Sequence, residues 1–316
     1  MSSINTNVAA MTALQSLTQT NKALTETQNR ISTGLRVSEA SDNAAYWSIA
    51  TTMRSDKAAL STVQDALGLG ASMVDVAYTA VDSAIDVVNQ IKTKLIAARE
   101  PGVDKAKVQT EITELQKQLK SIADSASFSG ENWLSVDSSA AGFNATKNVV
   151  ASFTRAGGAV TVQTIAIDTA GMDLFDANAG TTDAAAGILD GKRVAAGTIA
   201  EATGTFAIST LSIAALTDST ADVTTLNSYI SGADAAIKEM ATVASNLGAI
   251  KSRIDLQTDF VGNLMDALDR GIGTLVDADM NEESTRLQAL QVQQQLGIQA
   301  LSIANGSSQS ILSLFR

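Results

Sequence analysis

A long heptad repeat of apolar residues is the feature that most constrains how this chain can fold. Seven-residue steps connect one row of apolar positions: Met53, Leu60, Leu67, Val74, Val81, Val88 and Leu95. A second row lies three or four positions away: Val63, Ala77, Ala84, Ile91 and Ala98. Only Asp56 and Gly70 interrupt the pattern. The spacing predicts a coiled-coil-type helix over residues 49–98, roughly 75 Å long.

Two further apolar stripes are available to cover this seam. Glu100-Pro101-Gly102 should end the first helix and turn the chain. A shorter helix should then run back, with its own stripe: Val108, Ile112, Leu115, Leu119 and Ile122. A third stripe occupies residues 226–268, with Lys251 and Thr258 as polar exceptions. Since these helices can bury their stripes only against each other, the first and last thirds of the chain are expected to form one elongated bundle.

Composition restricts the chemistry open to the chain. It has no Cys and no His, so thiol nucleophiles, imidazole bases and the metal sites built from either are excluded. Carboxylate pairs and Lys or Ser–Lys chemistry stay open, but no such constellation stands out, and we expect no enzyme, metal or cofactor. The net charge of −11 argues against a nucleic-acid partner, because such affinity comes from clustered Lys and Arg.

Neither a leader nor a membrane anchor is visible in the sequence. The first residues lack the basic region and apolar core of a cleavable secretory signal. No run approaches the roughly 18 apolar residues that span a bilayer. We therefore expect a protein without a cleavable signal peptide and without membrane insertion.

Both ends of the chain are apolar but uncharged. The first charged side chain is Lys22, and residues 287–315 contain none. The apolar positions predicted to form a self-assembly core are Ile4, Val8, Met11, Leu14, Leu17, Leu24, Ile31, Leu287, Leu290, Leu296, Leu301, Ile303, Ile311 and Phe315. A helix with apolar stripes on two sides and no charge should be enclosed by other protein, since an unpaired buried charge costs several kcal/mol. Seven glutamines between 288 and 309 count against lipid as the enclosing medium.

The middle of the chain has a different composition, rich in Ala, Gly, Thr, Ser and Asp. Residues 149–153 and 160–167 flank Gly157-Gly158 and predict a hairpin, and residues 206–213 are a further candidate strand. The predicted fold class is therefore mainly α: a coiled-coil-like bundle formed by both chain ends, with a small β-rich outer domain inserted.

Three smaller features receive structural interpretations. The acids Asp168, Asp173, Asp176, Asp183 and Asp190 lack the spacing of an EF-hand, and a solvated surface is the favoured interpretation. Glu282 and Glu283, with Asp277 and Asp279, should cap the last helix and fill its first turn. The segment 271–273, Gly-Ile-Gly, is expected to be a hinge between two helical segments.

Motifs at both ends resemble those of one known family, bacterial flagellin. Residues 29–37 (NRISTGLRV) and 40–45 (ASDNAA) resemble its N-terminal signature. Residues 283–287 (ESTRL), 296–301 (LGIQAL) and 303–305 (IAN) resemble its C-terminal signature. The resemblance implies a structural subunit that self-assembles into the flagellar filament for motility, located outside the cell. It also implies contacts with the flagellar export apparatus, a chaperone, and hook-junction and cap proteins.

The family's architecture implies a division of this chain into five segments. These are a filament-core helix (1–44), rod-domain helices (45–136), a variable outer region whose first hairpin belongs to the rod domain (137–225), a rod-domain helix (226–270) and a second filament-core helix (271–316). Two alternatives stay open: a hook–filament junction protein of the same architecture, and a secreted membrane-active helical protein. An enzyme in the outer domain is a remote third.

In many flagellins two segments are read by host immune receptors, and the resemblance locates both here. The residues of these two segments are Arg30, Gly34, Asp42, Asn43, Ile91, Lys94 and Leu95, of which Asn43 stands in place of an Asp. Ser41 stands in place of the usual Lys, and Tyr46-Trp47 in place of a Gly-Leu pair. The segment 90–95 lacks the expected Arg and Glu. These departures argue against recognition.

Overall fold

The chain forms two compact units. A computed structural model describes residues 7–156, 159–178, 187–200 and 203–313. One unit comprises the two ends of the chain, up to Ala58 and from Leu264 onwards, and the other spans Ala59–Asn263. Two long helices contribute to both units: α2 (Ala44–Ala97) and α4 (Thr220–Val276). The finer division into five segments remains a prediction.

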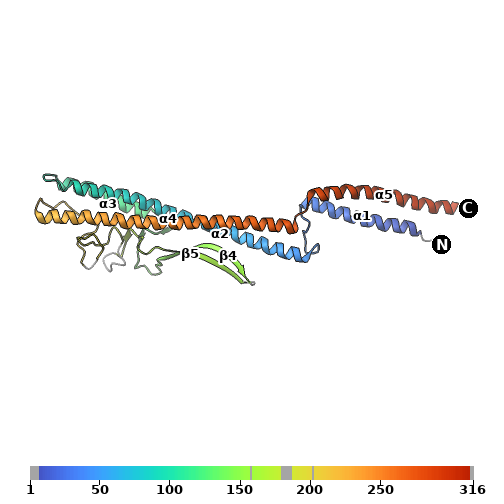
Figure 1. Cartoon of the computed structure of the whole chain (residues 1–316), viewed down its shortest axis with the longest axis horizontal. Helices are drawn as coiled ribbons and strands as arrows, with labels where there is room; N and C mark the ends of the chain where they lie inside the picture. Colours follow the sequence, from blue (N-terminus) through green and yellow to red (C-terminus); the bar gives the residue numbers. More distant parts are fainter. Residues whose placement is uncertain (1–6, 157–158, 179–186, 201–202, 314–316) are drawn as a thin grey trace. The chain divides into compact units, whose positions relative to one another are not determined.

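In the first unit, α1 (Val8–Thr33) and α5 (Met280–Ser313) lie side by side and antiparallel (Figure 1). Helix α1 begins at Asn7, whose side chain accepts a hydrogen bond from the Ala10 amide at 3.0 Å. It ends at Gly34, which adopts the left-handed conformation (φ 73°) that glycine tolerates without strain. Helix α5 begins after Asp279, whose carboxylate accepts from the Asn281 amide at 2.9 Å, so Asp279 has the predicted capping role.

A small apolar core joins the segments between the helices of this unit. Val37 packs with Ala50 of α2 and with Ile272 and Val276 of α4. The two linkers also pair through their backbones: the Ala278 amide donates to the Gly34 carbonyl at 2.9 Å, and the Arg36 amide to that of Val276 at 2.6 Å.

The predicted hinge at residues 271–273 is wrong. Helix α4 continues through Gly271 and Gly273 and ends at Val276. A Cβ atom at Gly271 would lie 2.8 Å from the Met53 side chain of α2, so this glycine permits a close helix–helix approach. The break lies at 277–279 instead, where the linker pairs with the residues after Gly34.

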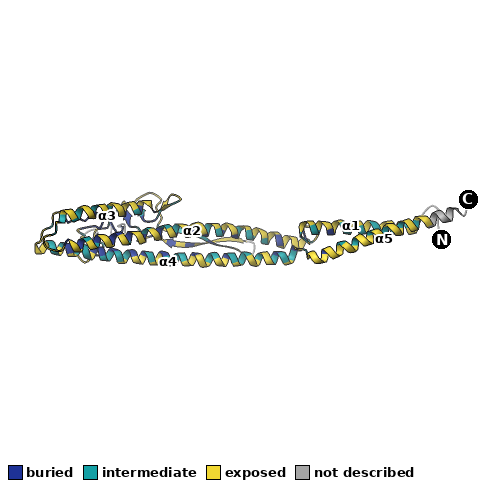
Figure 2. Ribbon diagram, turned by 90° about the horizontal axis from the view of Figure 1, so that it is seen from above, coloured by how far each residue is buried: buried dark blue, intermediate teal, exposed yellow. Residues whose placement is uncertain are grey.

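The second unit contains the predicted bundle, built from α2, α3 (Lys105–Ser125) and α4. The heptad stripe of α2 is buried: Leu67, Val74, Val81, Val88 and Leu95 are all 0% exposed. Ile112 and Leu119 of α3 and Ala233, Met240 and Ile254 of α4 are likewise fully buried. Figure 2 shows buried turns alternating with exposed ones along α2 and α4. Lys92 pairs with Asp234 at 2.5 Å and Lys94 with Glu111 at 2.5 Å, linking α2 to both partners.

The predicted hairpin is also present, as β4 (Thr146–Ala156) paired antiparallel with β5 (Ala159–Asp168). Gly157 and Gly158, between the two strands in the sequence, lie outside the described residues. Val149 of β4 packs against α2 where the heptad stripe is interrupted by Gly70, and a Cβ atom at Gly70 would overlap the Val149 side chain. The interruption in the stripe is therefore the position where the hairpin meets the helix.

Shorter strands and loops complete the second unit. Strands β1 (Ser127–Phe128) and β2 (Glu131–Asn132) pair antiparallel, and β3 (Ser135–Val136) pairs parallel with β6 (Phe175–Asp176). The strand predicted at residues 206–213 is wrong. These residues form an isolated bridge at Phe206 followed by turns, because their amides bond loop carbonyls, as Ser209 does with Leu189 at 2.8 Å. Their apolar side chains are nevertheless buried, which explains the strand-like sequence.

One buried arginine fastens these loops to α4. Arg193 is 0% exposed, and its guanidinium donates to the carbonyls of Ile188 and Gly197, each at 2.6 Å. It also forms an ion pair with Glu239 of α4 at 2.6 Å. A buried cation requires such partners, since a buried charge left unpaired is strongly destabilising. Nothing in the sequence pattern marked this residue.

Candidate self-assembly surface

The antiparallel pairing of α1 and α5 is fixed by contacts along its length. The Asn7 side chain donates to the Ala304 carbonyl at 2.9 Å, and the Gln294 side chain donates to Asn21 at 2.8 Å. Between them, Leu17 lies over Gly297, where a Cβ atom would come within 3.2 Å of the leucine. Two of these contacts use uncharged amide side chains, so this part of the pair needs no ion pair to set its register.

All ion pairs seen in this helix pair gather at one end. Glu283 is only 5% exposed, and it pairs with Arg30 at 3.2 Å and with Arg286 at 3.4 Å. Arg30 also pairs with Glu26 at 2.6 Å, and Arg286 with Glu282 at 2.9 Å. The network lies at the end next to the linkers; beyond it, Lys22 of α1 is the only charged side chain on the described part of the two helices.

The predicted core residues separate into two groups. Half-buried side chains line the contact between the helices: Leu17, Leu24, Ile31, Leu287, Leu290 and Leu301. Others point away from it and are largely exposed: Val8, Met11, Leu14, Leu296 and Ile303. Ile4 and Phe315 lie outside the described residues. Ile311 belongs to α5, but its side chain lies outside the part of the structure that is described.

The exposed group is larger than predicted. Val292 (55% exposed) and Ile298 (53%) add to it on α5. We call these seven residues, Val8, Met11, Leu14, Val292, Leu296, Ile298 and Ile303, the exposed apolar surface. Figure 2 shows the accompanying predominance of exposed residues along α1 and α5. Neither residue is among the predicted core positions: Val292 lies about one helical turn before Leu296, whereas Ile298 lies only two residues after it and therefore off that face.

The residues matched to immune-receptor segments lie in different units. Arg30 lies in the last turn of α1 and Gly34 caps that helix, whereas Asp42 and Asn43 directly precede α2. Asn43 caps that helix by accepting from the Ala45 and Tyr46 amides, both at 3.1 Å. The amides of Glu39 and Ser38 bond the Asp42 carboxylate and hold its pKa below the ordinary value.

The second matched segment is mostly inaccessible. Of its three matched residues, Ile91 and Leu95 are 0% exposed in the seam of the bundle, and Lys94 alone reaches solvent, paired with Glu111. A receptor contacting the folded chain would therefore find the lysine but neither apolar side chain. The expectation that receptors do not recognise these segments stays a prediction.

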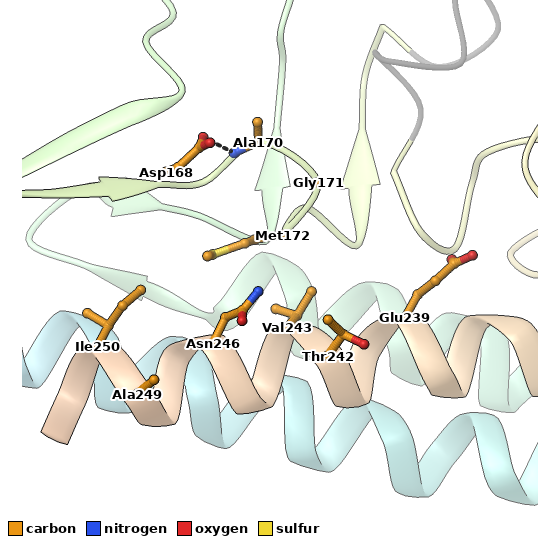
Figure 3. A pocket seen from close by; sticks show the side chains of 10 residues that line it. All are labelled: Asp168, Ala170, Gly171, Met172, Glu239, Thr242, Val243, Asn246, Ala249 and Ile250. Atoms are coloured by element: carbon orange, nitrogen blue, oxygen red, sulfur yellow. Dashed lines mark hydrogen bonds between the residues drawn. The ribbon is translucent and has the colours of Figure 1, made fainter. Parts of the chain in front are cut away.

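A groove of about 560 Å³ lies between α4 and the turn after β5 (Figure 3). Its walls include Met172 on the turn and Val243, Asn246 and Ile250 on α4. Its acids are already engaged: Asp168 accepts from the Ala170 amide at 3.0 Å, and Glu239 pairs with Arg193. The groove presents no nucleophile–base pair among the residues that line it.

Acidic residues in the outer loops are less solvated than expected. Asp176 is 3% exposed and accepts from the Ser138 and Asn178 amides at 3.0 and 2.9 Å. Burial, with the nearby Asp176 carboxylate, raises the pKa of both Asp173 and Asp190 to about 6. The solvated-surface interpretation is thus wrong for these three, whereas Asp168 is exposed and Asp183 lies outside the described residues. Among the described residues, no acidic group has an arrangement that could hold a metal ion.

Comparison with known proteins identifies the family of these paired helices. The family model for the bacterial flagellin N-terminal helical region matches residues 4–139, and that for the C-terminal helical region matches residues 230–315. The chain belongs to the bacterial flagellin family. It is 55% identical to Flagellin C of Rhizobium meliloti (strain 1021) and 49% identical to a flagellin of Brucella melitensis biotype 1, with all of each chain covered.

As a flagellin, the chain is a structural subunit of the extracellular flagellar filament, a helical polymer that serves motility. A third relative, Flagellin A of R. meliloti (strain 1021), is 47% identical over 396 aligned residues, again along the whole of both chains. The agreement with flagellins over the full length favours the filament subunit over a hook–filament junction protein. In the described helices, no segment is long and apolar enough to cross a membrane.

Proposed function

We propose that this flagellin polymerises by burying the exposed apolar surface of α1 and α5 against neighbouring copies of the chain. The observation that carries the proposal is the combination of exposure and missing charge: Val8 is 70% exposed, Leu296 57% and Ile303 74%, yet residues 287–315 contain no ionisable side chain. Burial of apolar surface contributes about 25 cal/mol per Å². An uncharged surface can be buried without leaving an unpaired ion behind.

The polar residues on these helices fit a protein interior. Gln294 and Asn21 already bond each other across the pair, which shows how amide side chains there can satisfy one another. In lipid, each amide without a partner would cost several kcal/mol. The amide-rich composition of α5 therefore supports association with other protein.

The remaining partners follow from the family. We propose that the subunit leaves the cell through the flagellar export apparatus, with a chaperone, and meets hook-junction and cap proteins during assembly. The net charge of −11 should keep the surface not used in assembly hydrated. Co-purification with an export chaperone in cells lacking the hook would test the export step separately from polymerisation.

Replacing Leu296 with Asp tests the assembly surface. In the polymer the carboxylate would be buried without a partner, at a cost of about 3–5 kcal/mol. Since each ~1.4 kcal/mol is tenfold in an equilibrium constant, the critical concentration should rise by about two to three and a half orders of magnitude. Sedimentation and negative-stain imaging of the purified chain measure this directly.

Leu256 provides a matched control. It is a leucine on a helix, 69% exposed, but it lies on α4 in the second unit. Leu256→Asp should assemble far better than Leu296→Asp, and thermal unfolding of both monomers should match the wild type. Equal critical concentrations for the two variants would contradict a dominant role for the α1–α5 surface.

A further inference from the structure

Met11 is the most exposed methionine in the described part of the chain. Its side chain is 64% exposed, compared with 46% for Met280, 7% for Met172 and 0% for Met240. The chain contains eight methionines and no cysteine. Methionine thioethers are therefore its only sulfur atoms that an oxidant could attack.

The surroundings of Met11 leave its sulfur open to small molecules. Met11 lines a hollow of about 550 Å³ on α1, together with Val8, Leu14 and three polar residues, Thr12, Gln15 and Thr18. Among the described residues that line this hollow none is acidic or basic. A small neutral oxidant such as hydrogen peroxide can reach the exposed sulfur from solvent. The same sulfur sits in the exposed apolar surface, which the assembled polymer would cover.

We propose that Met11 is an oxidation site of the free subunit, and that its conversion to methionine sulfoxide by hydrogen peroxide prevents assembly. The sulfur lone pair attacks one peroxide oxygen and a sulfur–oxygen bond forms as the oxygen–oxygen bond breaks. A proton moves to the departing oxygen, which leaves as water. The sulfur is oxidised by two electrons and the peroxide is reduced by two.

This inference rests on the proposed function, because the Met11 sulfoxide would affect assembly of the polymer and not the monomer. The sulfoxide replaces an apolar atom with a strong hydrogen-bond acceptor. In the monomer that oxygen meets water, so folding should be unaffected. In the interface it would be buried beside Val8 and Leu14, and the nearby Thr12 and Thr18 hydroxyls already donate to backbone carbonyls. A strong acceptor buried there without a partner is costly. Because sulfoxide reductases reverse the reaction, the site would act as a reversible block on polymerisation.

The first experiment maps oxidation. Purified monomer and preformed filament are treated with hydrogen peroxide, and sulfoxide at each methionine is quantified by peptide mass spectrometry. Met11 should react fastest in the monomer, Met280 next, and Met172 and Met240 slowest. In the filament, Met11 should be protected by at least about tenfold. Equal reactivity of Met11 and Met240 in the monomer, or no protection in the filament, would overturn the proposal.

The second experiment measures the consequence with Met11→Leu, which keeps the apolar side chain but cannot form a sulfoxide. Oxidised wild-type protein should show a critical concentration about ten- to a hundredfold higher than untreated protein. Oxidised Met11→Leu should assemble like untreated Met11→Leu, whereas Met280→Leu should remain as sensitive as the wild type.

The two proposals fail in different ways. Oxidised wild-type protein that assembles at the unchanged critical concentration would overturn the oxidation block and leave the assembly surface intact. Untreated protein that polymerises without covering Met11 would contradict the assembly surface itself, and the oxidation block with it.

Discussion

Apolar stripes run along the helices of both units of this flagellin, but a single chain buries the stripes to different extents. In the second unit, the stripe of α2 from Leu67 to Leu95 is fully buried against α3 and α4. In the first unit, α1 and α5 bury only one side of each helix, and residues such as Val8 and Ile303 remain more than two-thirds exposed. One region is complete within a single chain, whereas the other is incomplete.

The two units also differ in the charges on the exposed faces of their helices. The bundle helices carry ion pairs on their exposed faces, such as Lys92 with Asp234 and Lys251 with Asp75. Helix α5 carries none beyond Arg286. A helix face that stays in water usually carries charged residues. The lack of charge along α5 therefore indicates a surface that other protein covers.

Removing the incomplete region should have the largest effect. A fragment of residues 34–279 lacks α1 and α5 but keeps Val37 and its partners Ala50, Ile272 and Val276. It should unfold cooperatively as a helical monomer and form no filament at concentrations where the full chain is wholly polymerised. Circular dichroism and sedimentation velocity check both statements. Polymers of the fragment would contradict the requirement for α1 and α5 in assembly. A non-cooperative thermal transition would contradict the claim that the second unit is complete within a single chain.

A pair of leucine truncations should separate the regions by folding stability. Leu67→Ala removes a side chain that is 0% exposed and should destabilise the monomer by about 2–5 kcal/mol. Leu296→Ala removes one that is 57% exposed and should change the stability by at most about 0.5 kcal/mol. Urea unfolding of the monomers measures the difference. Similar losses from both would mean that α5 is already packed in the single chain.

Two glycines in α2 test how tightly the bundle meets its hairpin. Gly70→Ala would push a methyl group into Val149 and should destabilise the monomer by about 1–3 kcal/mol. Gly68 has no atom within 4 Å of an added Cβ, so Gly68→Ala should instead stabilise the helix by about 0.5–1 kcal/mol. Adding Val149→Ala should rescue Gly70→Ala. The same sign for both glycine variants in thermal unfolding would refute the close contact.

The smallest expected effect is a change of folding stability with pH, caused by two carboxyl groups in the outer loops of the second unit. Asp173 and Asp190 have pKa values near 6 in the folded chain, above the ordinary value of 3.8. The folded state therefore binds more protons than the unfolded state between these values, and stability falls as pH rises through that window. Both carboxyls keep some contact with water, which limits the loss to about 1 kcal/mol.

Unfolding at pH 4.5, 6 and 7.5 checks this direction. The wild type should be most stable at the lowest of these values, and Asp173→Asn with Asp190→Asn should flatten the dependence. Asp168→Asn, at an exposed carboxyl of the same region, serves as the control. Stability that increases with pH in this range would mean that the two carboxylates are better stabilised in the folded chain than in water.

Periodicity predicted the elements whose packing follows from a repeated pattern. The seven-residue spacing of α2 located its buried face, and the residues around Gly157-Gly158 located the hairpin. The interruption at Gly70 was visible in the sequence, but its role as the contact with Val149 was not, because that contact joins residues far apart in the chain. A local sequence pattern does not predict which distant residues come into contact.

Where tertiary contacts determine the local conformation, the sequence pattern predicted the wrong structure or predicted none. Gly271 and Gly273 suggested a hinge, yet packing against α2 keeps α4 helical there. Residues 206–213 alternate like a strand but form buried turns. The pairing of Arg193 with Glu239 left no periodic trace. For the candidate surface, lack of charge located α1 and α5, but only the structure separates half-buried Leu17 from exposed Leu14.

An electron-microscopic reconstruction of filaments grown from the purified chain would show which surfaces the subunits bury against one another. We expect most residues of the exposed apolar surface to lie within about 4.5 Å of apolar carbon atoms in neighbouring subunits: Val8, Met11, Leu14, Val292, Leu296, Ile298 and Ile303. We also expect the seam of α2, α3 and α4 to remain within each subunit. Filaments held together by the second unit alone, with the exposed apolar surface still facing water, would contradict these expectations.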